Sequence, residues 1–121
     1  MLETKVLNSL KALGEDFLCE IISIYLRDLS GFVTRIEKAV SIKDAAEGSI
    51  AAHSLRGASY SLGAKSVGDI CYTFERAFDD EEFDGLPPLL PKLKKEVEMT
   101  QSELDHLHQK LTRSMEAYSE K

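Results

Sequence analysis

One short segment carries a histidine, an arginine and a glycine at helical spacing, and these residue types suit phosphoryl chemistry. His53 is followed by Arg56 after three positions and Gly57 after four, which places all three on one helix face. A neutral imidazole offers a nucleophilic lone pair, and a guanidinium binds phosphate oxygens. A mid-helix glycine costs roughly 1 kcal/mol relative to alanine, so Gly57 indicates close approach by another protein. The segment predicts a phosphoryl carrier, in which His53 accepts the group, Arg56 balances its charge and Gly57 gives the partner clearance.

The other face of this helix is made of small and apolar side chains. It comprises Ala51, Ala52, Leu55, Ala58, Ser59 and Leu62. Such a narrow face lets neighbouring helices approach closely, as expected of a central helix in a bundle. Within it, we expect the Ser59 hydroxyl to serve packing rather than function, bonded to the preceding turn or to a neighbouring helix.

The segment resembles the signature of the histidine-containing phosphotransfer (HPt) domain family, roughly His-x-Leu-Lys-Gly-x-Ser-x-x-Leu-Gly-Ala. The matching positions are His53, Leu55, Gly57, Ser59, Leu62, Gly63 and Ala64. Arg56 replaces the usual lysine and keeps its charge. The family's continuing pattern is similar to the residues downstream, at Val67, Cys71, Phe74 and Glu75. With helical blocks of matching length on both sides, the likeness extends over most of the chain.

The resemblance implies a relay of phosphoryl groups between receiver-domain aspartates in a multistep two-component phosphorelay. The implied partners are a response-regulator receiver domain and a hybrid sensor histidine kinase. We expect no bound cofactor, because the chain has no acidic constellation suited to magnesium and no glycine-rich phosphate loop. Mg²⁺ and a further lysine would come from the receiver. The expected protein is a phosphoryl carrier without ATP-dependent kinase activity of its own.

Three other functions remain open at this point. The chain could be a noncatalytic helical module that binds a receiver or histidine kinase and regulates it by occupancy. It could also be the phosphoacceptor domain of a chemotaxis-type kinase, although such domains usually continue into further modules. An autophosphorylating kinase core fits less well, because Ser54 and Ala58 occupy positions where such cores carry an acidic residue and a proline. The chain also has no room for an ATP-binding domain.

The remaining histidines and the cysteines do not predict a metal site. His106 and His108 are two residues apart, so on a helix they point about 200° away from each other. Cys19 and Cys71 lie in helical apolar patterns without metal-ligand spacing. We expect two buried free thiols, with His108 at the bundle edge and His106 in solvent.

Charge and hydropathy exclude further classes of function. The formal net charge of −6 argues against general nucleic-acid binding, which depends on clustered Lys and Arg. No apolar run approaches the roughly 20 residues of a membrane span, and the first residues lack a secretory layout. We therefore expect a cytoplasmic protein that binds neither nucleic acid nor membrane.

The hydrophobic periodicity predicts an all-α fold. Helices are expected to end at Gly14, to run from residue 15 to about 40, to begin near Lys43 or Asp44 and close at Gly63, and to span about 66–80. Prolines at 87, 88 and 91 introduce the last helix, and residues after Tyr118 are expected to fray. The predicted architecture is an up-down antiparallel four-helix bundle with an additional short N-terminal helix. It forms a single domain over 1–121, with a bundle core of about 15–118, and is expected to be monomeric.

Four residues are candidate contacts for the partner. Ile50 and Tyr60 flank His53 on its helix. Ile21 and Tyr25 lie on an edge that widens the apolar stripe of the preceding helix. That edge is open to two interpretations, a wide core contact or a docking surface.

Overall fold

Five α-helices make up the protein in the computed structural model, which describes residues 1–119 and their side chains through Ala117. They are α1 (Thr4–Ala12), α2 (Glu15–Ile42), α3 (Ala45–Ser61), α4 (Lys65–Asp79) and α5 (Leu89–Ser119). The described part of the chain contains no strand, so the predicted all-α class is confirmed. Each predicted helix is present, with ends that differ by a few residues. The predicted fraying after Tyr118 concerns the end of the chain, where residues 120–121 lie outside the described residues.

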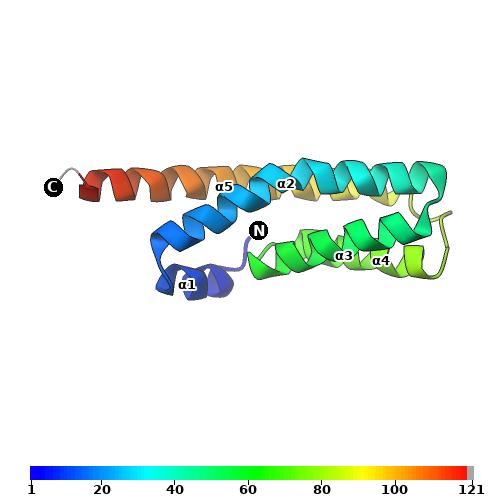
Figure 1. The fold of residues 1–121 in the computed structure, drawn as a ribbon, viewed down its shortest axis with the longest axis horizontal. Helices are drawn as coiled ribbons and strands as arrows, with labels where there is room; N and C mark the ends of the chain where they lie inside the picture. Colours follow the sequence, from blue (N-terminus) through cyan, green and yellow to red (C-terminus); the bar gives the residue numbers. More distant parts are fainter. Residues whose placement is uncertain (120–121) are drawn as a thin grey trace.

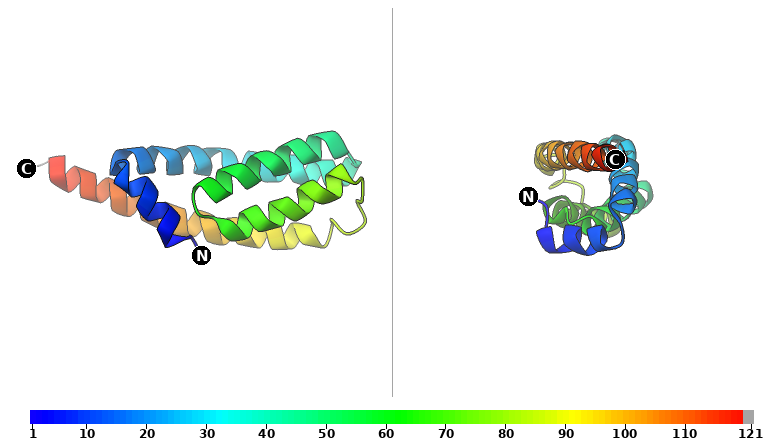
Figure 2. Two further views of the ribbon diagram at one scale, coloured as in Figure 1. Left: turned by 90° about the horizontal axis from the view of Figure 1, so that it is seen from below. Right: turned by 90° about the vertical axis from the view of Figure 1, so that its left-hand side faces the viewer.

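The four long helices form the predicted bundle. The two longest, α2 and α5, lie side by side in one layer, while α3 and α4 form a helical hairpin in the other (Figure 1). Viewed end-on, the four surround a common core, and α1 covers one end (Figure 2). A hydrogen bond of 2.8 Å from the Glu3 amide to the Gly63 carbonyl ties the start of α1 to the α3–α4 turn. The short N-terminal helix therefore closes the end of the bundle at which α3 stops.

The ends of α3 follow from local sequence. Asp44 is its N-cap, and its side chain accepts a hydrogen bond of 3.1 Å from the Glu47 amide, as aspartate commonly does at this position. At the other end Gly63 has a φ of +80°, which glycine adopts at little cost. These two residues fix where the central helix begins and where the chain turns back into α4.

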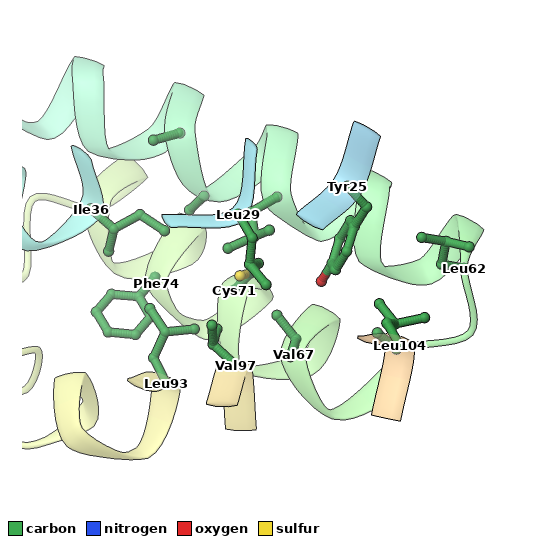
Figure 3. Close-up of a cluster of buried hydrophobic side chains, with 14 of the residues drawn as sticks. Tyr25, Leu29, Ile36, Leu62, Val67, Cys71, Phe74, Leu93, Val97 and Leu104 are labelled. Carbon is green, nitrogen blue, oxygen red and sulfur yellow. The ribbon is translucent and has the colours of Figure 1, made fainter. Parts of the chain in front are cut away.

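The core is apolar and receives side chains from all four bundle helices. Ile36, Phe74 and Leu93, which come from α2, α4 and α5, are fully buried together (Figure 3). Gly48 on α3 is also buried, and a Cβ added to it would collide with the Phe78 ring. The small residues of α3 therefore bring α3 and α4 close together, in agreement with the narrow face read from the sequence.

Polar and thiol groups inside the bundle are placed largely as predicted. The Tyr25 hydroxyl and the Ser59 Oγ form a buried hydrogen bond of 2.7 Å between α2 and α3. Ser59 thus packs against a neighbouring helix, and burial raises the pKa of Tyr25 to about 12. The two cysteines are free and buried. At the bundle edge, His108 Nε2 lies 2.8 Å from Ser23 Oγ, while His106 is exposed.

Candidate functional site

His53 projects from the middle of α3 into solvent, with 64% of its side chain exposed. The inward face of the same helix is buried, where Ala51, Ala52 and Leu55 have no exposed surface. Packing of these apolar residues fixes the helix while leaving the imidazole accessible. The structure thus places His53 where a partner can reach it.

A carboxylate on the neighbouring helix orients the ring. Glu75 on α4 has its Oε2 atom 2.9 Å from His53 Nδ1, and only 13% of its side chain is exposed. An ionised carboxylate only accepts hydrogen bonds, so Nδ1 carries the proton and donates it. The hydrogen bond made by one ring nitrogen determines the state of the other. Nε2 is therefore left with the lone pair and with no protein group bonded to it among the described residues.

Arg56 lies beside the same edge of the ring. Its Nη1 atom is 3.2 Å from Glu75 Oε1, and its Nη2 atom is 3.2 Å from His53 Nδ1. A guanidinium nitrogen only donates, so once Nδ1 carries a proton the second contact is proximity without a hydrogen bond. The alternative tautomer would point the Nδ1 lone pair at the carboxylate oxygen 2.9 Å away, which is repulsive. We therefore assign the proton on Nδ1 to the bond with Glu75.

Gly57 is exposed, and the protein itself does not require a glycine there. A Cβ built at Gly57 meets no atom within 4 Å, so neither packing nor backbone strain explains the residue. Helix propensity disfavours it. The open space one turn from His53 is what the clearance prediction requires, and the role itself stays a prediction.

Comparison with known proteins identifies the family of the chain. A family model described as the Hpt domain matches residues 20–116. The chain belongs to the Hpt domain family. That membership confirms the resemblance carried by the His53 segment, and the matched residues include most of each of the four bundle helices.

Individual relatives of this Hpt domain are distant in sequence. Histidine-containing phosphotransfer protein 2 of Arabidopsis thaliana is 23% identical over 95 residues, which are 76% of this chain. The chain spans 61% of the length of that curated relative.

Solved structures show the same fold. Histidine-containing phosphotransfer protein B of Pseudomonas aeruginosa PAO1 superposes with a TM-score of 0.85 at 23% identity, covering 90% of this chain and 95% of that one. The phosphotransfer protein MtHPt2 of Medicago truncatula gives 0.78 at 22% identity, covering 97% and 82%. Both support the bundle architecture of the Hpt domain.

The four predicted docking residues separate into two groups. Ile50 and Tyr60 are exposed by 57% and 39%, on the same outer side of α3 as His53. Ile21 is partly buried against the core. Tyr25 is only 5% exposed, so its prediction as a docking residue is wrong. It points inward because its hydroxyl finds the buried Ser59 partner, which makes the Tyr25 edge a core contact.

Tyr60 is held firmly at the surface of the Hpt domain. Its ring packs over Gly68 of α4, where a Cβ would collide with it. Its hydroxyl donates a hydrogen bond of 2.6 Å to Asp69, which also binds Lys65 at 2.9 Å. The Asp69 hydrogen bond raises the pKa of Tyr60 to about 12. A fixed aromatic ring of this kind makes a good anchor for a partner.

Sequence reasoning missed two contacts at this site. The resemblance to the family includes Glu75 but assigns it no role, and no sequence pattern indicates Tyr72. Both lie on the α4 face that meets α3, three residues apart. The available signal was an acidic residue directly after the buried Phe74, on the edge of an apolar stripe.

Two classes of site are not found among residues 1–119. That part of the chain contains no group of three or more His, Cys, Asp or Glu placed to hold a metal ion. None of its helices combines the length and apolar character needed to cross a bilayer.

Proposed function

We propose that this Hpt domain relays a phosphoryl group between receiver-domain aspartates, with Nε2 of His53 as the carrier atom. The supporting observation is the 2.9 Å contact between His53 Nδ1 and the largely buried Glu75 carboxylate. It selects the tautomer whose nucleophilic nitrogen faces solvent.

The geometry supports transfer of the phosphoryl group to His53 by direct attack of Nε2. The Nε2 lone pair attacks the phosphorus of a partner's aspartyl phosphate, so that an N–P bond forms while the P–O bond to the aspartate breaks. The aspartate departs as a carboxylate, and the proton on Nδ1 stays in place. The ring thereby gains positive charge, which the Glu75 carboxylate offsets. A second receiver's aspartate reverses the step by attacking the same phosphorus and releasing neutral imidazole.

Charge on the transferring oxygens needs cations close by. Arg56 is the candidate on this chain, since its guanidinium lies 3.2 Å from the ring of His53. We assign the Mg²⁺ and a further lysine to the receiver. In this proposal the chain itself binds no cofactor or metal and hydrolyses no ATP.

The partner surface is proposed to surround His53 on α3. Gly57 allows close approach, while the exposed Ile50 and the fixed Tyr60 ring supply apolar contact. The partners would be a response-regulator receiver domain and a hybrid sensor histidine kinase, met by a monomer in the cytoplasm. The steric and apolar features support a protein partner rather than a small ligand.

The test is phosphotransfer from a panel of phosphorylated receiver domains to the wild type and to His53→Gln. We expect label on the wild type alone, labile in acid and able to return to a receiver. His106→Gln is the matched control, because it removes an exposed histidine from α5 and should label normally. Receiver binding with no label on any variant would refute the relay and favour regulation by occupancy.

A further inference from the structure

Tyr72 on α4 lies against the guanidinium of Arg56. The Arg56 Cζ atom is 5.5 Å from the centre of the Tyr72 ring, within the range of a cation–π interaction. Tyr72 is 46% exposed, yet the arginine beneath it is only 26% exposed. An aromatic side chain at the surface therefore covers the cation that accompanies His53.

The ion pair with Glu75 leaves Arg56 incompletely fixed. An arginine side chain has considerable rotamer freedom, and holding it in one geometry costs free energy. Glu75 Oε1 is buried and has no aligned hydrogen bond, even though Arg56 Nη1 lies 3.2 Å away. The attraction is thus electrostatic and weakly directional. The Tyr72 ring supplies a second wall that restricts where the guanidinium can go.

Helix geometry places these groups in one unit. Tyr72 precedes Glu75 by three residues, so both point from the same face of α4. Arg56 follows His53 by three residues on α3. One helix thus presents the histidine and its cation, while the other presents the carboxylate and the aromatic ring that hold them.

We propose that Tyr72 is a positioning residue, which acts through Arg56 by keeping its guanidinium beside His53 for phosphoryl transfer. This inference rests on the proposed relay function. Tyr72 itself need not touch the phosphoryl group or the partner. The tyrosine hydroxyl is also dispensable in this proposal, because the ring face makes the contact.

A double-mutant cycle tests this role. Transfer from one phosphorylated receiver at saturating concentration is measured for Tyr72→Phe and Tyr72→Leu, each in the wild type and in Arg56→Gln. Tyr72→Leu should slow transfer two- to fivefold, equivalent to about 0.5–1 kcal/mol, and Tyr72→Phe should keep the wild-type rate. In the Arg56→Gln background, Tyr72→Leu should have no further effect.

Three results would overturn the proposal. In the first, Tyr72→Leu transfers at the wild-type rate. In the second, the loss of transfer rate caused by Tyr72→Leu persists in the Arg56→Gln background. In the third, Tyr72→Phe is as slow as Tyr72→Leu. The second result would instead make Tyr72 a direct receiver contact. Thermal unfolding of each variant identifies any rate loss that comes from unfolding.

A second measurement needs no receiver. Stacking should shift the NMR signals of the Arg56 side-chain protons upfield through the ring current, in the wild type and in Tyr72→Phe but not in Tyr72→Leu. Unshifted wild-type signals would refute the stacking. If wild-type His53 accepted no label, the relay function would fail by itself, and the NMR comparison would still decide whether Tyr72 holds Arg56.

Discussion

Replacing Gly57 with alanine should make the protein more stable and a worse carrier. The added Cβ would meet no atom within 4 Å, so no packing penalty opposes the gain in helix propensity. That gain is about 0.5–1 kcal/mol. For a domain of this size it corresponds to a rise of about 2–4 °C in the unfolding midpoint.

The same methyl group should impair transfer, because it occupies the space left open for a partner one turn from His53. A displacement of about 1 Å in a reacting pair can reduce the rate roughly 100-fold. Since a docked receiver can adjust in part, we expect a loss of roughly 10- to 100-fold. A variant that is more stable but transfers more slowly would show that the loss of transfer comes from lost clearance for the partner and not from impaired folding.

Thermal unfolding and single-turnover transfer from a phosphorylated receiver measure the two effects. Gly31→Ala is the matched control, because Gly31 is also exposed in mid-helix with no atom near its missing Cβ. It should give a similar stability gain with a smaller loss of transfer. Wild-type transfer by Gly57→Ala, or equal losses in the two variants, would refute clearance as the reason for Gly57.

Three further predictions concern the α3–α4 contact, the site and the stability of the fold. Gly48→Ala should destabilise the protein by about 1–3 kcal/mol in urea unfolding, because the added Cβ collides with Phe78. Adding Phe78→Leu to that variant should restore part of the lost stability. Glu75→Ala should slow transfer roughly 10-fold or more and let the imidazole exchange tautomers, seen by ¹⁵N NMR, whereas Glu75→Gln keeps an acceptor oxygen and should retain more activity. Stability should be full below about pH 9 and fall as the pH rises toward 12, because the folded state raises the pKa values of Cys71, Tyr25 and Tyr60. Tyr25→Phe should reduce that fall when unfolding is measured against pH.

The sequence alone predicted the helices and the exposed histidine, because both depend on the spacing of residues within a single segment. Helical periodicity places Leu55 inside and His53 outside without knowledge of any neighbour. The segment from His53 to Gly57 is contiguous, so its geometry follows from one helix. The same holds for Asp44, whose capping bond reaches only three residues ahead.

Contacts between helices could not be predicted from the spacing of residues within each helix. Whether Glu75 meets His53 depends on how α4 slides and rotates against α3, and periodicity does not specify that register. Tyr25 shows the same limit, since its angular position on α2 was known but the helix that covers it was not. Its burial became clear only from the position of Ser59 across the interface.

That register is itself held by pairs on both sides of the site. Along the antiparallel α3–α4 interface, Ser49 bonds to Asp79, His53 to Glu75 and Tyr60 to Asp69. From one pair to the next, the residue number rises along α3 and falls along α4, as expected of antiparallel helices. The two outer pairs therefore hold the same helix register as the central pair. A change in helix packing that separated His53 from Glu75 would also stretch the Ser49–Asp79 and Tyr60–Asp69 hydrogen bonds. The carrier histidine thus takes its tautomer from a contact that the whole helical hairpin maintains, so the orientation of a side chain exposed to partners does not depend on the partner.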